Sequence, residues 1–152
     1  MENESAKELW ESFQQQISNL PEQYDVWAFG DSKELADQLA SLVLAGLKTA
    51  TCSLKRMYDM EGFDLPKVGA YSVILDGDGL AVGIIQNIET FVFPFDEVTE
   101  DIVIAEGGGD RTVDYWTEAH KEFFKRECQS AGESFSTKMD VVFERFELVY
   151  AA

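Results

Sequence analysis

The sequence is poor in the residues that metal sites and many nucleophilic sites require. Its 152 residues include one histidine, His120, and two cysteines, Cys52 and Cys128, which form no CxxC pair. Structural zinc sites draw on several cysteine and histidine ligands, so the sequence predicts no metal site and no bound cofactor. A Ser-His-Asp triad would have to run through His120.

Long apolar runs are also missing. No stretch approaches the roughly 20 apolar residues that cross a bilayer, and residues 1–5 lack the apolar region of a secretory signal. We therefore expect a cytoplasmic protein with no membrane partner, whose cysteines are reduced thiols.

Basic residues are scarce as well, with 12 Lys and Arg against 29 Asp and Glu and a net charge of −17. Proteins hold long nucleic acids largely through basic side chains that neutralise phosphates, so this balance disfavours RNA as a partner. Residues 33–67 hold as many bases as acids and are therefore neutral. Two interpretations follow: an acidic surface that favours solubility, or a locally less negative pocket for a small uncharged or weakly charged ligand.

The first half of the chain predicts two helices followed by strands. A helix over about 5–19 begins with the capping-box pair Ser5 and Glu8. A second helix is opened by Asp31 and ends at Gly46. Strands are expected over 48–54, 70–75 and 80–93, with a hairpin turn at 76–79 and a kink or bulge near Gly83.

The second half predicts a short helix that ends near Glu106, a long helix capped by Asp110, and a closing strand over 139–150. On the long helix, His120 shares an apolar face with Trp116 and Phe123, so we expect a packed, hydrogen-bonded core histidine. The order of elements predicts one α+β domain over 1–152, with a small, strongly bent sheet or barrel and helices outside it.

The segment Lys48-Thr49-Ala50-Thr51 has the most potential for chemistry. A lysine acts as a general base where burial lowers its pKa, and it then activates a neighbouring hydroxyl. Spacing alone favours the alternative of a surface lysine beside ordinary strand threonines. On a regular strand Lys48 and Thr51 point to opposite faces, so they converge only if Lys48 lies in the preceding turn or the strand is bulged.

Five segments resemble, in order, the uncharacterised bacterial branch of the ASCH family. They read WAFGD, GLKTATCS, PKVG, EGGGDR and YWTEAH, and cover residues 27–31, 46–53, 66–69, 106–111 and 115–120. The resemblance extends over nearly the whole chain and implies a PUA-like fold: a small bent β-barrel with flanking helices and a cleft. The family has been proposed to bind RNA. A smaller bacterial relative is an amidohydrolase that removes the acetyl group from acetylcytidine.

The resemblance implies three catalytic residues. That relative uses a lysine, a threonine three residues later and a downstream glutamate, which fall here on Lys48, Thr51 and Glu106. The first two share the pattern Gly-x-Lys-Thr-x-Thr, and the glutamate follows a Thr-Glu pair by six residues. Ser53 stands where the relative has an arginine, and Gly108 where the branch has a glutamate. These departures concern the substrate more than the catalytic residues.

The implied function is hydrolysis of a small acylated nucleoside or a related amide. Thr51 would attack the carbonyl, neutral Lys48 would take its proton, and Glu106 would position water or protonate the leaving amine. A protonated Lys48 would instead stabilise the oxyanion. The alternative is an RNA- or modified-nucleotide-binding module, or a ribonuclease-like relative, without amide hydrolysis.

Further substrate contacts are predicted from four residues near the shared segments. Trp27 is expected either to stack on a base or to pack in the core. Thr49, Asp110 and Arg111 complete the predicted substrate-binding residues. The expected partner is a small nucleoside-like molecule, and the expected state is a monomer or small homo-oligomer.

Overall fold

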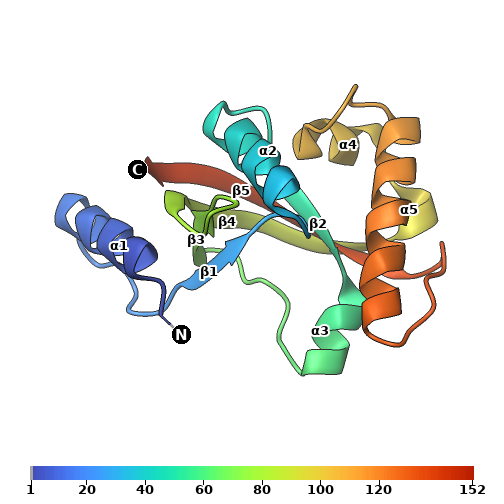
Figure 1. Cartoon of the computed structure of the whole chain (residues 1–152), viewed down its shortest axis with the longest axis horizontal. Coiled ribbons are helices and arrows are strands. Elements are labelled where there is room, and N and C mark those ends of the chain that lie inside the picture. Colours follow the sequence, from blue (N-terminus) through green and yellow to red (C-terminus); the bar gives the residue numbers. More distant parts are fainter. Residues whose placement is uncertain (1) are drawn as a thin grey trace.

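Five strands form one curled sheet, and the helices pack against separate parts of it (Figure 1). The computed structural model describes residues 2–152. The helices are α1 (Glu4–Gln16), α2 (Lys33–Leu44), α3 (Lys55–Glu61), α4 (Glu100–Glu106) and α5 (Val113–Ser130), with a 3-10 turn at Phe95–Glu97. The strands are β1 (Asp25–Ala28), β2 (Ala50–Leu54), β3 (Tyr71–Leu75), β4 (Ala81–Pro94) and β5 (Asp140–Ala151). The predicted α+β class is confirmed.

The sheet has the strand order β1-β3-β4-β5-β2, with β1 parallel to β3 and all other neighbours antiparallel. Register shifts interrupt the β4–β5 ladder between Ile84 and Ile85 and between Asn87 and Glu89. Such bulges bend a strand and increase its twist. The two long strands therefore curl into a half-barrel with β1 and β2 at its edges, as the predicted bent sheet requires. The β3–β4 register also shifts beside Gly83, which confirms the bulge expected there.

The first helix differs from its prediction at both ends. Asn3 is the N-cap and accepts from the backbone N–H of Ala6, whereas the hydroxyl of Ser5 donates to Asn3 and accepts from the backbone N–H of Ala81. The helix ends at Gln16, so Ile17 lies beyond it and is exposed. The predicted range of about 5–19 is therefore too long at the C-terminal end.

The second helix is capped by Ser32, whose hydroxyl accepts from the N–H of Leu35, and not by Asp31. Asp31 instead pairs with Arg126 of α5, with 2.8 Å between Oδ2 and Nε. The sequence also predicts no helix over residues 55–61, where the structure has α3. None of these residues is fully buried, so the segment lacks the apolar stripe that marks a helix in a sequence.

The core divides into three clusters along the sheet. Helix α1 covers one end of it, α2 packs on the middle, and α4 and α5 cover the other end. The space between α2 on one side and α4 and α5 on the other is where the candidate site lies. Among the described residues, no helix is long and apolar enough to cross a membrane.

Candidate functional site

Lys48 lies in the turn between α2 and β2, one of the two placements that lets it converge with Thr51. Gly46 adopts the left-handed conformation with φ of 76° just after the helix, as predicted for its C′ residue. The backbone N–H groups of Leu47 and Lys48 both donate to the carbonyl of Leu42, at 2.9 and 3.1 Å. The turn therefore directs the Lys48 side chain before the strand begins.

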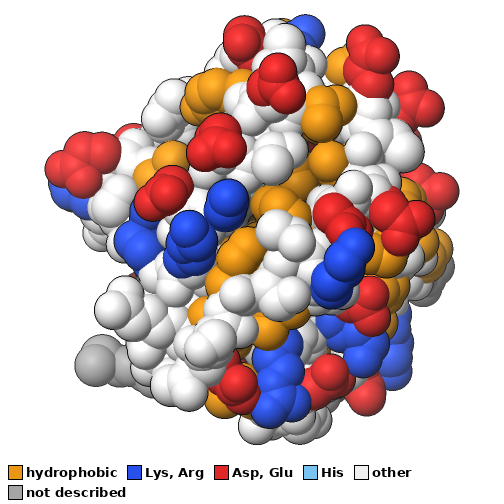
Figure 2. Space-filling model, turned by 90° about the vertical axis from the view of Figure 1, so that its right-hand side faces the viewer, with side chains coloured by type: hydrophobic (Ala, Val, Ile, Leu, Met, Phe, Trp, Pro, Cys, Tyr) orange, Lys and Arg blue, Asp and Glu red, His pale blue; other side chains and the backbone are white. Residues whose placement is uncertain are grey.

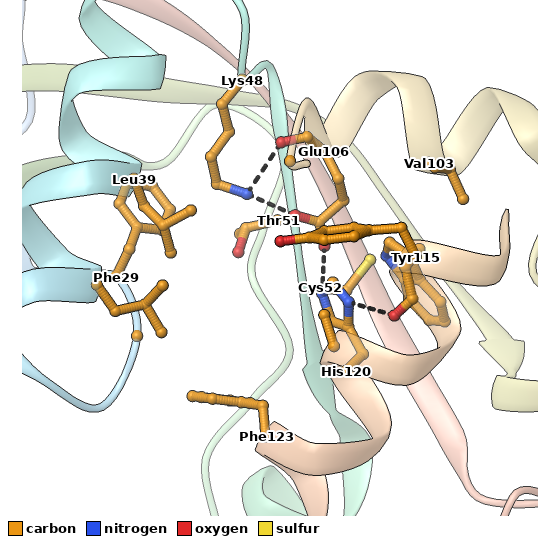
Figure 3. Close-up of a pocket in the computed structure, with 15 residues that line it drawn as sticks. Phe29, Leu39, Lys48, Thr51, Cys52, Val103, Glu106, Tyr115, His120 and Phe123 are labelled. Atoms are coloured by element: carbon orange, nitrogen blue, oxygen red, sulfur yellow. Dashed lines mark hydrogen bonds and ion pairs between the residues drawn. The ribbon is translucent and has the colours of Figure 1, made fainter. Parts of the chain in front are cut away.

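The Lys48 side chain is buried and paired with Glu106, the last residue of α4. Lys48 is 3% exposed and Glu106 is 6% exposed. Lys48 Nζ donates to Glu106 Oε2 at 2.5 Å (Figure 3). It also donates to the Ala50 carbonyl at 2.7 Å. The next residue, Gly107, has φ of 74°, and a Cβ there would overlap the carbonyl of Leu47. Glycine thus allows the end of α4 to approach the Lys48 turn.

Glu106 remains ionised although it is fully buried. Burial by itself raises the pKa of its carboxyl, but the charges of Lys48 and His120 and the hydrogen bonds from both outweigh that effect. The pKa of Glu106 is therefore held well below its usual range.

His120 is packed and hydrogen-bonded, as predicted, but it belongs to the site rather than to the core alone. Its ring stacks on Trp116, with 4.2 Å between ring centroids. Nε2 lies 3.1 Å from Glu106 Oε1, and Nδ1 lies 3.0 Å from the Trp116 carbonyl oxygen. The side chain is 21% exposed and lines the same cavity as Lys48. The sequence signal that could have identified His120 as a site residue is its place in the shared segment YWTEAH.

The three predicted catalytic residues line one narrow cavity of about 150 Å³ (Figure 3). Thr51 contributes from β2, Lys48 from the turn before it and Glu106 from α4. The rest of the wall is largely apolar and comes from α2, α4, α5 and the segment after β1; its members include Phe29, Leu35, Leu39, Val103, Tyr115, Trp116 and Phe123. The cavity can therefore enclose a small apolar group next to a hydroxyl and an ion pair.

A wide cleft of about 670 Å³ adjoins the narrow cavity, and both are lined by Phe29, Gly30, Thr51, Cys52 and Phe123. Trp27 of β1 lines this wide cleft, partly buried, with its ring 4.7 Å from that of Phe29. Trp27 packs partly against the core, as one alternative predicts, and the stacking of a base on it stays a prediction. The wide cleft also holds the carboxyl groups of Glu127 and Glu144.

The structure does not bring the other three predicted substrate-binding residues to this cavity. The Thr49 hydroxyl donates to the Ala105 carbonyl at 3.2 Å, and Thr49 and Arg111 line a separate hollow. Asp110 is exposed and accepts from the backbone N–H and hydroxyl of Thr112, at 3.0 and 2.6 Å. Thr112, not Asp110, is the N-cap of α5.

Cys52 is a cavity residue that the sequence did not indicate. It is buried, and burial raises the pKa of its thiol well above the usual value, with the nearby Glu106 carboxylate acting in the same direction. The thiol therefore stays neutral and is a poor nucleophile. Within residues 2–152, no three His, Cys, Asp or Glu side chains are grouped as metal ligands.

Residues 25–150 match the family model of the ASCH domain. The chain belongs to the ASCH domain family. This membership confirms the resemblance drawn from the five sequence segments. Helix α1 lies before the matched region. A comparison with curated protein sequences finds no match.

Two solved structures resemble this ASCH protein over almost its whole length. Protein EF3133 from Enterococcus faecalis V583 is 38% identical, with a TM-score of 0.92 over 97% of this chain and 89% of that one. An ASCH domain from Lactobacillus crispatus JV V101 is 34% identical, with a TM-score of 0.90 over 99% and 96% of the two chains. A hypothetical protein, PH0355, shares the fold at 18% identity, with a TM-score of 0.55 over 82% of this chain and 99% of that one.

Proposed function

We propose that this ASCH protein hydrolyses the amide bond of a small acylated nucleoside or a related amide. The observation that carries the proposal is the buried Lys48–Glu106 pair at the wall of a cavity that Thr51 also lines. Thr51 Oγ1 attacks the carbonyl carbon and neutral Lys48 accepts the hydroxyl proton. Glu106 positions the hydrolytic water or protonates the leaving amine.

The burial of this ion pair supports a functional role. Removing two charges from water is expensive, and well-packed apolar residues in the same place often give an equally stable protein. Buried charged groups that line a cavity are therefore candidates for chemistry. Lys48 and Glu106 meet both conditions, because each is nearly inaccessible and each lines the cavity.

The two adjoining spaces suggest how a substrate lies. Thr51 lines both of them, so the bond that is cleaved would lie where they meet. The narrow cavity has an apolar wall that suits a small acyl group. The wide cleft has room for a nucleoside, with the partly buried Trp27 as a surface on which a base stacks.

Long RNA fits this surface poorly. Most of the basic side chains are already paired with carboxylates; the pairs are Lys33–Asp37, Lys48–Glu106, Lys55–Asp59, Arg56–Glu133, Lys67–Asp64, Arg126–Asp31, Lys138–Asp96 and Arg145–Glu89. On the face that includes α5, Lys and Arg side chains lie among Asp and Glu side chains (Figure 2). Phosphates would have to compete with these carboxylates, so we expect a nucleoside-sized partner.

A screen of acylated nucleosides and other small amides, with detection of the released acid and amine, tests the proposal. We expect turnover by the wild type and a loss of about 100-fold or more in Thr51→Ala and Lys48→Ala. Thr117→Ala, which removes a threonine hydroxyl from α5 outside the cavity lining, serves as the matched control and should keep its activity. A Lys48→Ala variant as fast as the wild type excludes any catalytic role for Lys48.

Binding of a nucleoside without turnover would favour the alternative of a binding module. The salt dependence of any RNA binding separates that alternative further. A steep fall of affinity with salt would indicate phosphate contacts, whereas a flat slope would exclude them.

A further inference from the structure

The ring of His120 lies between two hydrogen-bond acceptors. Nδ1 is 3.0 Å from the carbonyl oxygen of Trp116, which can only accept, so Nδ1 carries a hydrogen. A neutral imidazole has one N–H, which would leave a lone pair on Nε2 facing Glu106 Oε1 at 3.1 Å. An ionised carboxylate also only accepts. The contact between His120 and Glu106 therefore requires a second proton.

That second proton lies on His120. Lys48 Nζ donates to Glu106 Oε2 at 2.5 Å, and the Lys48 charge lowers the pKa of the Glu106 carboxyl against the effect of burial, so Glu106 is ionised. An imidazolium donates from both ring nitrogens and satisfies both acceptors. Glu106 is then a single carboxylate between two cations, with Lys48 on Oε2 and His120 on Oε1.

We propose that His120 is a positioning residue, whose imidazolium holds Glu106 as a carboxylate and lets Lys48 give up its proton. This inference rests on the proposed function, because it explains how Lys48 becomes the base. Two cations on one carboxylate repel each other, so the cluster releases one proton more readily than an isolated Lys–Glu pair. Glu106 keeps a countercharge after that release.

The hydrogen bonds that each neutral form would keep support Lys48 as the cation that loses the proton. A neutral Lys48 keeps two N–H donors, enough for the bonds to Glu106 Oε2 at 2.5 Å and the Ala50 carbonyl at 2.7 Å, and loses only the 3.5 Å contact to the Glu106 carbonyl. A neutral His120 would lose its bond to Glu106. The other titratable groups at the cavity are the Cys52 thiol and the Tyr115 hydroxyl. Burial keeps the thiol protonated by raising its pKa, so it adds no charge.

The neutral Lys48 amine then accepts the Thr51 hydroxyl proton. As that proton moves to Nζ, Oγ1 forms a bond to the substrate carbonyl carbon, and the π electron pair of the carbonyl moves to its oxygen. His120 does not accept the moving proton in this step. Its effect reaches the reaction through Glu106.

The charge state of His120 can be measured without any substrate. The chain contains a single histidine, so the side-chain ¹⁵N resonances of the labelled full-length protein need no assignment. We expect both ring nitrogens to show imidazolium shifts at pH 8, where a free histidine is deprotonated. Glu106→Gln should convert the ring to its neutral form at that pH. Lys125→Gln, which removes a positive charge from an exposed position of α5, should leave the shifts unchanged. A neutral ring in the wild type overturns the inference.

His120→Gln tests the effect on Lys48. Glutamine can donate to Glu106 but carries no charge, so Lys48 should hold its proton to higher pH. We expect about 10-fold lower kcat/KM at pH 7, equal to a shift of the acid limb by about one pH unit, with recovery above pH 9. An equal loss at every pH would mean that His120 is only structural. If the wild type hydrolyses no amide, the proposed function fails, and the ¹⁵N shifts alone still decide the charge state of His120.

Discussion

The narrow cavity and the wide cleft meet at Thr51, but they hold their carboxyl groups in opposite ways. In the narrow cavity, Glu106 is fully buried between Lys48 and His120, and its pKa lies well below the usual value. In the wide cleft, burial raises the pKa of both Glu127 and Glu144. Glu127 Oε1 has no hydrogen-bond partner among the described residues.

This difference shows that burial alone does not set the state of a carboxyl group. The deeper group stays ionised because Lys48 and His120 face it, whereas the shallower groups lack such partners. A chain with a net charge of −17 has few bases to distribute, and it places one of them, Lys48, in the interior. We therefore expect that replacing the Glu106 carboxyl with an amide lowers the stability of the fold, whereas the same replacement at Glu127 raises it.

Glu106→Gln should cause the largest loss of stability. It leaves Lys48 buried without a countercharge, so the free energy of unfolding in urea should fall by about 3–5 kcal/mol at pH 7. The double variant Lys48→Met/Glu106→Gln removes both charges and should recover most of that loss. Equal stabilities of the wild type and Glu106→Gln would show that the pair is not electrostatically coupled.

The difference in stability between the wild type and Glu106→Gln should shrink at low pH. The pKa of Glu106 is lower in the folded state than in the unfolded chain, where it is about 4.3. The wild type therefore keeps its full advantage over Glu106→Gln above that value and loses it as the pH falls further. An advantage that grew on acidification would contradict the low pKa.

Gly107→Ala should have the next largest effect, because the narrow cavity depends on a close backbone approach. Gly107 and Gly62 have nearly the same φ, 74° and 72°, but a Cβ at 107 would overlap the Leu47 carbonyl, whereas one at 62 would meet open space. We expect Gly107→Ala to lose about 2–4 kcal/mol from strain and overlap together. Gly62→Ala, the matched control near the wide cleft, should lose only the strain of about 1–2 kcal/mol. Similar losses in both variants would mean that the approach to Leu47 is not tight.

The regular elements of this fold could be predicted because their signals are local. The hairpin turn at 76–79 and the bulge beside Gly83 depend on glycine, and the long helix after residue 110 has a clear apolar face. The helix caps were misplaced by one or two residues, because Asp31 and Ser32, or Asp110 and Thr112, offer equally good cap chemistry. For the first pair a tertiary partner distinguishes the two, because Asp31 is occupied by Arg126.

The candidate site was partly accessible to sequence reasoning. The turn that redirects Lys48 follows from Gly46, but the pairing of Lys48 with Glu106 spans 58 positions and is not visible in any local pattern. His120 was predicted as a core residue because its helical spacing matches that of Trp116. Spacing cannot show that one edge of a buried ring meets a carboxylate from another helix.

Glu127→Gln should have the smallest effect, and the opposite sign. Because burial raises the pKa of Glu127 in the folded state, the folded protein binds its proton more tightly than the unfolded chain, and stability falls as the pH rises through that range. Glutamine does not titrate. The variant should therefore be more stable than the wild type at pH 7, by less than about 1 kcal/mol since solvent screens the half-buried carboxylate. The difference should disappear below about pH 4, where Glu127 is protonated in both states.

Urea unfolding of the wild type and Glu127→Gln at pH 4 and pH 7 measures this difference in stability, with Glu122→Gln on the same helix as the control. A loss of stability at pH 7 would mean that the Glu127 carboxylate has a stabilising partner, and the contrast between the two spaces would then rest on Glu144 alone.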